Sequence, residues 1–319
     1  MASFSPRRSG YPTAMAQGPV RPPNTMIRFI GQCIYCRSTE NLIGEEHLIP
    51  VALGGYEYLG NAACESCRDL TGRAESVWLQ SLRDFRMATG LGNTRQRAKH
   101  LTAPLLKGTA QSHEKVRVPM EYHPRWVGLP IFERAGFLFP RNTQGLRLAG
   151  GAVINFRSLA VTAEYLGTRQ MGMAQKMPYE AFARFVSKVA YGYAIAKLGL
   201  DAMTEVMVLP AIRGEPSLLG RWVGTDTTRL QPSGSAKHYD NTPIRHEVGI
   251  GTWPILDQPN APHVVRTVQF FSHVEAPVYE VIIGTIPANF ELPDHFNILR
   301  ELRCDRPFGV SARRDSVAS

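Results

Sequence analysis

The stretch that decides the N-terminal fold runs from residue 33 to residue 67 and reads CIYCRSTENLIGEEHLIPVALGGYEYLGNAACESC. It begins with one Cys-x-x-Cys pair, Cys33 and Cys36, and ends with a second, Cys64 and Cys67. Four thiolates are the donor set of a closed, tetrahedral, structural zinc site, with redox dithiols as the alternative. The 27 residues between the pairs exceed the spacing of a simple zinc ribbon, so we expect the ion to hold a larger fold together.

Between the two cysteine pairs lies a run of residue types in a distinctive order. An acidic residue precedes His47 directly, two aliphatic residues and Pro50 follow, and a Gly-Gly turn leads to Leu59-Gly60-Asn61 and to a Cys-x-x-Cys that opens a helix. In this order, over about residues 30–76, the chain resembles the HNH endonuclease family. The resemblance implies a two-stranded hairpin packed on a helix, called the ββα-metal finger, held by the cysteines.

The same resemblance implies roles for three side chains. His47 is expected to be the general base, Glu46 a ligand of a catalytic Mg²⁺ or Mn²⁺ ion, and Asn61 the residue that orients the segment carrying the histidine. A neutral imidazole accepts a proton near pH 7, and a carboxylate is the hard oxygen ligand that these ions prefer. Because neighbouring strand residues point to opposite faces, Glu46 and His47 share a site only if the strand bends, which we expect before Pro50.

Two departures from the family pattern affect these assignments. The family commonly has His or Asn after the second cysteine pair as a further ligand, whereas this chain has Arg68, which cannot bind a cation. The second ligand is therefore expected to be Asp69 or Glu75. Asn61 also precedes Cys64 by three positions, where five is more usual.

Basic residues follow the second cysteine pair. Apolar residues at helical spacing predict a helix from Glu65 to about Ala88, with Arg68 and Arg73 either contacting phosphates or forming a solvated face. Residues 91–120 carry six Lys or Arg against one Glu, a net charge of +5. This segment either tracks a phosphate backbone or is a solvated connector. Its candidate contacts are Arg95, Arg97 and Lys99.

The composition limits the class of protein that the chain can be. The 319 residues are 44% apolar, enough to bury a sizeable core, and the apolar runs are too short for a membrane span. A formal net charge of +9 favours a polyanionic partner. The N-terminal residues have no signal-peptide core, so we expect a cytoplasmic protein. The predicted organisation is a disordered arm at 1–26, an HNH domain at 27–90, a basic linker at 91–118, a mixed domain at 119–304 and a flexible tail at 305–319.

The second half is predicted to mix strands and helices. The residues between Tyr179 and Leu198 have a helical apolar stripe. Segments 264–271 and 278–286 read as an antiparallel hairpin, and further strands are expected at 126–139, 146–156 and 205–212. The fold class is therefore α+β, with an N-terminal ββα-metal zinc finger followed by a mixed α+β domain.

The function expected from the sequence is metal-dependent endonuclease activity on DNA, with RNA as an alternative substrate. Two other interpretations stay open. One is a zinc-stabilised nucleic-acid-binding module that does not cut, for which Arg68 is the argument. The other is a nuclease effector controlled by a C-terminal sensor domain. Residues 119–304 are also a candidate surface for a second copy of the chain or a protein partner. An HNH protein with such an extra domain resembles nucleases of phage defence or of mobile elements.

Overall fold

A computed structural model describes most of the chain. The described residues are 23–89, 91, 102–108, 113–119, 122–138, 145–157, 159–168, 171–172, 177–229, 246–255, 258–274 and 276–290. Most of the expected arm, the tail, Cys304, and the candidate contacts Arg95, Arg97 and Lys99 lie outside these residues.

The N-terminal part is a small sheet followed by a helix. Strand β2 (Leu42–His47) pairs antiparallel with β3 (Glu57–Cys64), and β1 (Thr25–Phe29) pairs parallel with the other edge of β3. A short 3₁₀ turn, η1 (Val51–Leu53), connects β2 to β3, and α1 (Glu65–Ser81) follows β3 directly. The expected hairpin and helix are present, with β1 as an additional strand.

The Gly-Gly turn after η1 has a steric cause. Gly54 has a φ of 89°, in the left-handed region that glycine adopts without penalty. At Gly55 an added Cβ would lie 1.9 Å from the Ile49 carbonyl oxygen. Both glycines therefore serve the reversal between β2 and β3.

The helix expected from Glu65 to about Ala88 is interrupted. Helix α1 ends at Ser81, and α2 (Arg83–Thr89) begins after Leu82, which is buried. The apolar spacing continues across the break because both helices place their apolar side chains in the same core.

The middle of the chain forms two smaller sheets. Strand β4 (Thr102–Gly108) pairs with β5 (His113–Pro119) and with β8 (Met171–Gly172), and β6 (Arg125–Phe132) pairs with β7 (Leu148–Arg157). Helix α3 spans Leu159–Tyr165. The segment expected to be a basic linker thus contains two paired strands.

The largest sheet has the strand order β10-β13-β12-β11, with β9 also pairing with β13. Its strands are β9 (Glu205–Val206), β10 (Val223–Thr225), β11 (His246–Ile255), β12 (Gln258–Phe270) and β13 (Val278–Thr285). The predicted hairpin is confirmed, because β12 and β13 pair antiparallel with Val268 opposite Tyr279.

One element predicted for this half of the chain is confirmed and another is wrong in part. Helix α4 (Tyr179–Leu198) has the predicted bounds. The strand predicted at 205–212 is wrong beyond Val206, since α5 (Leu209–Arg213) follows, with a proline in its first turn, where proline is well tolerated. Short helices η3 (Pro216–Leu218), α6 (Leu219–Trp222), η4 (Thr227–Arg229) and η5 (Ser272–Val274) complete the described elements.

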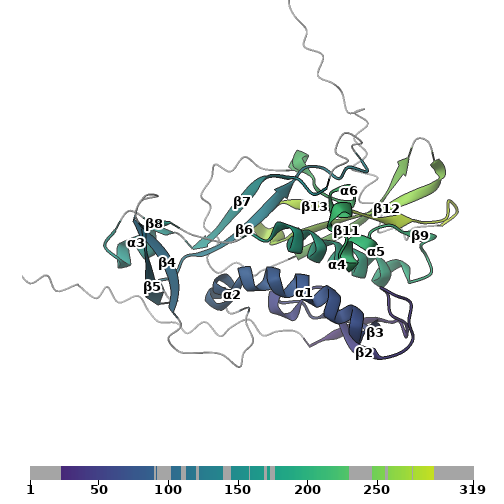
Figure 1. Cartoon of the computed structure of the whole chain (residues 1–319), viewed down its shortest axis with the longest axis horizontal. Helices are drawn as coiled ribbons and strands as arrows, with labels where there is room; N and C mark the ends of the chain where they lie inside the picture. Colours follow the sequence, from purple (N-terminus) through teal and green to yellow (C-terminus); the bar gives the residue numbers. More distant parts are fainter. Residues whose placement is uncertain are drawn as a thin grey trace, which may run out of the picture.

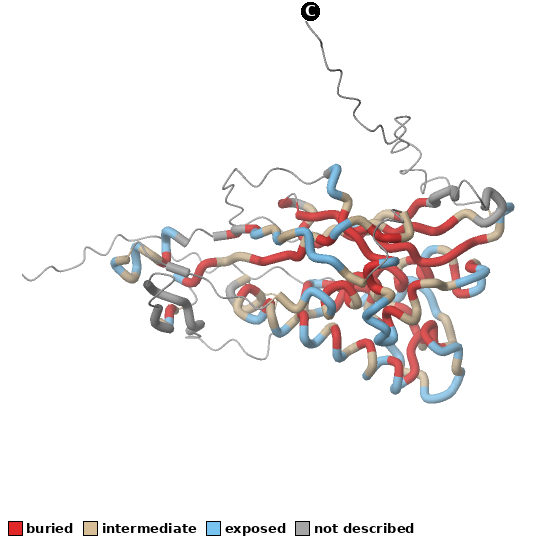
Figure 2. Tube along the Cα trace, turned by 45° about the horizontal axis from the view of Figure 1, so that its top comes forward, coloured by how far each residue is buried: buried red, intermediate tan, exposed pale blue. Residues whose placement is uncertain are grey.

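Helix α4 lies between the N-terminal finger and the largest sheet (Figure 1). The ring centroid of Phe182 in α4 lies 4.4 Å from that of Trp78 in α1 and 4.9 Å from that of Tyr279 in β13. One continuous cluster of buried residues joins the finger to the rest (Figure 2). The inner face of the finger is therefore covered by α4. None of the described helices is long and apolar enough to span a membrane.

Replacing Trp78 with alanine should weaken the whole fold, because this side chain is 1% exposed and links α1 to α4. We expect the free energy of unfolding to fall by about 3–5 kcal/mol, as for other large core truncations. Denaturant unfolding followed by circular dichroism measures it. The neighbouring Val77→Ala, at a position that is 48% exposed, is the control and should change stability little. Equal losses in both variants would contradict the role of Trp78 as the link.

Candidate functional site

Four cysteines meet at the base of the finger. Cys33 and Cys36 flank the turn after β1, Cys64 ends β3, and Cys67 lies in the first turn of α1. Their Sγ atoms all lie within 4.8 Å of one another, and none is in a disulfide. Zinc–sulfur bonds of about 2.3 Å in a tetrahedron place sulfurs about 3.8 Å apart, and Cys36 Sγ is 3.6 Å from Cys64 Sγ. The quartet therefore fits a structural zinc ion.

The surroundings of the thiols differ in ways that matter before metal binds. Burial raises the pKa of Cys33 and of Cys67. The Ser66 hydroxyl, 3.2 Å from Cys64 Sγ, lowers the pKa of Cys64 to about 6. Of these three thiols, Cys64 ionises most readily, and a zinc ion would supply the charge that keeps the buried thiols ionised.

His47 lies at the end of β2 and faces outward. Its Nε2 is 3.2 Å from Oε2 of Glu45, and the two side chains are 20% and 46% exposed. Asn24 donates a hydrogen bond of 3.1 Å to the same Glu45 oxygen. Residues 45 and 47 share a face because side chains alternate along a strand. The strand remains paired through His47, opposite Tyr58, so the carboxylate beside the histidine is Glu45 and not Glu46.

Glu46 points to the opposite, inner face. It is 4% exposed and accepts a hydrogen bond of 2.9 Å from the Tyr35 hydroxyl. Lys188 Nζ of α4 lies 3.0 Å from Glu46 Oε1 and donates a 2.8 Å hydrogen bond to Glu75 Oε2. The structure therefore brings together two of the expected metal ligands, Glu46 and Glu75, with an ammonium group between them.

The charge states of Lys188 and Tyr35 follow from the carboxylates that lie close to them. Burial by itself lowers the pKa of Lys188, but the negative charges of Glu46 and Glu75 outweigh it, and the net shift is upward. Burial, reinforced by the Glu46 charge, raises the pKa of Tyr35. Lys188 is thus a cation and Tyr35 a neutral hydrogen-bond donor at neutral pH.

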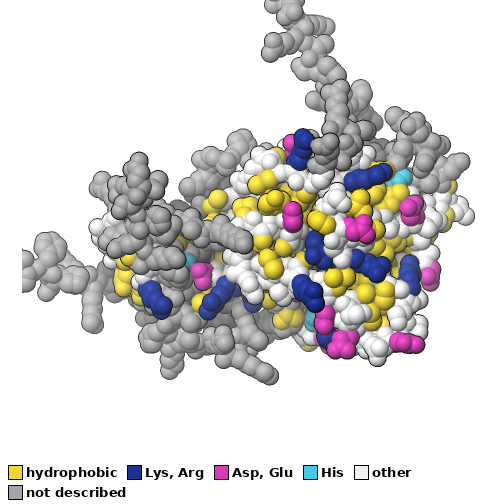
Figure 3. Space-filling model, in the orientation of Figure 1, with side chains coloured by type: hydrophobic (Ala, Val, Ile, Leu, Met, Phe, Trp, Pro, Cys, Tyr) yellow, Lys and Arg dark blue, Asp and Glu magenta, His cyan; other side chains and the backbone are white. Residues whose placement is uncertain are grey.

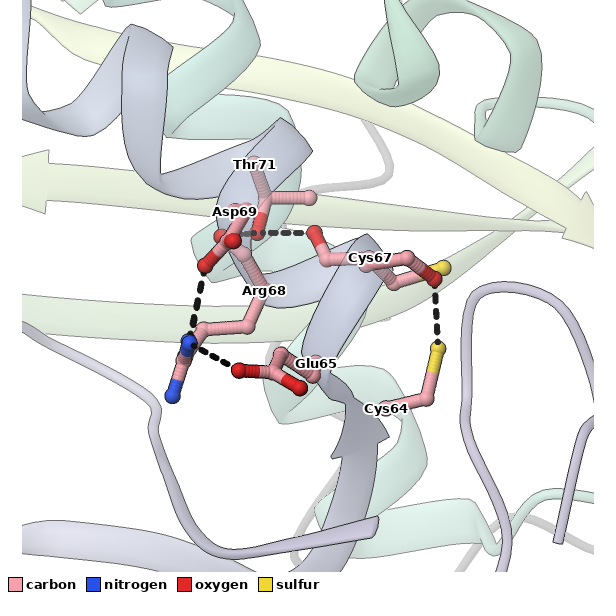
Figure 4. Close-up of polar contacts among 7 residues, drawn as sticks. Cys64, Glu65, Cys67, Arg68, Asp69 and Thr71 are labelled. Atoms are coloured by element: carbon pink, nitrogen blue, oxygen red, sulfur yellow. Dashed lines mark hydrogen bonds and ion pairs between the residues drawn. The ribbon is translucent and has the colours of Figure 1, made fainter. Parts of the chain in front are cut away.

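The remaining predicted residues lie elsewhere. Arg68 bonds Asp69 Oδ1 through Nε and a terminal nitrogen, at 3.0 and 2.9 Å, and lies 3.6 Å from Glu65. Figure 4 shows Arg68 turned toward these carboxylates and away from Cys64 and Cys67. Arg73 is exposed on α1. Asn61 has a φ of 48°, where the pairing of β2 with β3 shifts register, and no contact joins it to His47 among those observed.

The catalytic ion implied by the family resemblance does not fit this arrangement. Within the described part of the chain, the cysteine quartet is the one group of three or more His, Cys, Asp or Glu side chains close enough to hold a metal ion. Asp69 is engaged by Arg68, and the space between Glu46 and Glu75 holds the Lys188 ammonium.

Comparison with known families supports the finger. Residues 33–74 match the family model described as HNH endonuclease. This segment is an HNH domain. The match contains both cysteine pairs, Glu46, His47 and Asn61, and it links the protein to nucleases and nucleic acid. No curated protein and no solved structure matches the chain.

Sequence reasoning missed three residues of this region. Glu45 was signalled by strand alternation, which predicts that it shares a face with His47. Tyr35 and Lys188 had no comparable signal, since Lys188 is 113 residues from Glu75 and becomes its neighbour only through folding.

Cys64→Ser should remove the zinc ion from the HNH domain and unfold the finger, because structural zinc binding contributes on the order of 10 kcal/mol to folding. Elemental analysis of the purified protein should show loss of about one zinc per chain, with reduced helical signal. Cys304→Ser, at the cysteine outside the quartet, should retain the metal. Full zinc content in Cys64→Ser would contradict the assignment.

Proposed function

We propose that the HNH domain hydrolyses phosphodiester bonds in DNA, with His47 as the general base. The observation that carries this proposal is the His47–Glu45 pair at the outward end of β2, inside the segment that matches the family. The buried face of the same strand offers no histidine. A substrate phosphate would therefore approach the outer face of the hairpin.

The chemistry that we propose begins with a water molecule beside His47. The imidazole accepts a proton from this water through the ring nitrogen that carries no proton in its neutral form. As the imidazole takes this proton, the water oxygen bonds to phosphorus and the bond from phosphorus to the 3′ oxygen breaks. That oxygen accepts a proton from a second water molecule to become a 3′-hydroxyl, and the other product carries a 5′-phosphate, as the family resemblance implies. The Glu45 carboxylate would stabilise the imidazolium.

Arg73 is the best placed of the predicted phosphate contacts in the described part of the chain, because it is exposed on α1. Arg68 would have to leave Asp69 in order to bind a phosphate. Lys and Arg side chains on the face drawn in Figure 3 lie near Asp and Glu side chains. The net charge of +9 is expected to attract DNA over a distance.

The sequence leads us to propose further that cleavage needs Mg²⁺ or Mn²⁺, that DNA is the substrate and that the protein is cytoplasmic. We also propose that the C-terminal half controls cleavage or associates with a partner or a second copy. We assign no step to a catalytic ion, because Glu46 and Glu75 are bridged by Lys188.

His47→Ala should lower the rate of plasmid cleavage by about 10²–10⁴, because it removes the proton acceptor. Zinc content and DNA affinity should stay at the wild-type level. Cleavage is measured with purified protein in buffers containing Mg²⁺, Mn²⁺ or neither. Glu45→Gln, which keeps the shape of the neighbour but not its charge, should lower the rate less. Wild-type cleavage by His47→Ala would exclude His47 as the base.

One observation favours a second function, binding nucleic acid without cutting it. Glu46 and Glu75 both pair with Lys188 of α4, so these two carboxylates are not open to a metal ion. An HNH domain in this state keeps its fold and its surface for DNA. Wild-type protein that binds plasmid DNA and leaves it intact in all three buffers would establish this function in place of the first.

Arg73→Ala should weaken DNA binding similarly for unrelated sequences, because a phosphate contact carries no base information. The slope of log affinity against log salt concentration should decrease by about 1. Fluorescence anisotropy with a labelled duplex at several salt concentrations measures both. Lys197→Ala, at an exposed position on α4, is the control and should change neither. An unchanged slope in Arg73→Ala would contradict the contact.

A further inference from the structure

A cluster on the inner face of the finger resembles a metal site, but its cation is a lysine ammonium group. It consists of Lys188, Glu46, Glu75 and Tyr35. Two carboxylates from the HNH finger converge on one ammonium nitrogen, at 3.0 and 2.8 Å. The side chains of Lys188 and Glu46 are both nearly buried, and Tyr35 donates a further hydrogen bond to Glu46. Without a cation the two adjacent carboxylates would repel each other, and the buried Glu46 would carry a large desolvation cost.

We propose that the Lys188 ammonium replaces a divalent ion between Glu46 and Glu75, and that removing this one charge opens a site for Mn²⁺ or Mg²⁺. In the native protein the finger then holds zinc at the cysteines and no divalent ion at the carboxylates. Such ions require oxygen ligands, which Glu46, Glu75 and entering water would supply once the ammonium is gone.

The position of Lys188 is fixed by the packing of its helix against the finger. Tyr191 donates a 2.7 Å hydrogen bond to the Ile34 carbonyl, and Tyr193 donates a 2.7 Å hydrogen bond to Glu57. At Gly192 an added Cβ would lie 3.0 Å from Leu48, so α4 approaches the end of β2 closely. A divalent ion could therefore enter only by displacing the ammonium from two carboxylates while the helix stays in place.

The test compares Mn²⁺ binding by zinc-loaded, full-length variants, using electron paramagnetic resonance of the free ion. Wild type and Glu75→Gln should bind Mn²⁺ equally, because neither has an open carboxylate pair. Lys188→Met should bind one additional Mn²⁺ ion per chain, and the double variant Lys188→Met/Glu75→Gln should lose it. Lys197→Met makes the same chemical change at an exposed position of α4 and should behave as wild type.

Two results would overturn the proposal. One is a Mn²⁺ site in the wild-type protein that Glu75→Gln abolishes. Comparing Mn²⁺ binding by these two proteins tests the proposal even if Lys188→Met does not fold. The other is a folded Lys188→Met that gains no Mn²⁺. The readout is metal binding, so a protein that fails to cut DNA, which would contradict the proposed hydrolysis, still gives a decisive result here.

Discussion

The burial of α4 on both of its sides is the constraint on which the rest of the structure depends. Twelve of its residues are buried, so it cannot lie on a surface and must be covered by other elements. The largest sheet covers one side, and α1 with the hairpin of the HNH domain covers the other. The finger is thus part of a common core, and the inner face of β2 is part of the protein interior.

This burial separates two neighbouring residues of the motif. Glu46 faces α4 and His47 faces outward, because β2 stays extended and paired up to its last residue. A carboxylate in the interior needs a cation and hydrogen-bond donors, which Lys188 and Tyr35 supply. On the outer face His47 has a different carboxylate, Glu45, close to water. The packing of α4 thus determines the surroundings of Glu46, whereas Glu45 is the carboxylate that contacts His47.

The local pattern of the sequence was enough to predict much of this fold. The cysteine quartet, the hairpin with its Gly-Gly turn and the bounds of α4 all follow from spacing within a short window, and the structure has each of them. The extent of the strand expected at 205–212 was wrong, because Pro210 allows a helix to start where β-branched content favours a strand. Leu82 divides the long helix although the apolar spacing continues through it.

The partners of the site residues were harder to predict, and the reason is physical. The expected bend before Pro50 would have joined Glu46 to His47, but strand pairing continues through both, and alternation then assigns them to opposite faces. Lys188 reaches the finger through tertiary packing of α4, which no local pattern encodes. The family match ends at residue 74, before Glu75 and Lys188. The matched residues therefore specify the backbone of an HNH domain, whereas the charge that faces its buried carboxylate comes from outside the match. In this protein the ion chemistry of the inner face is decided by a helix that the motif does not include.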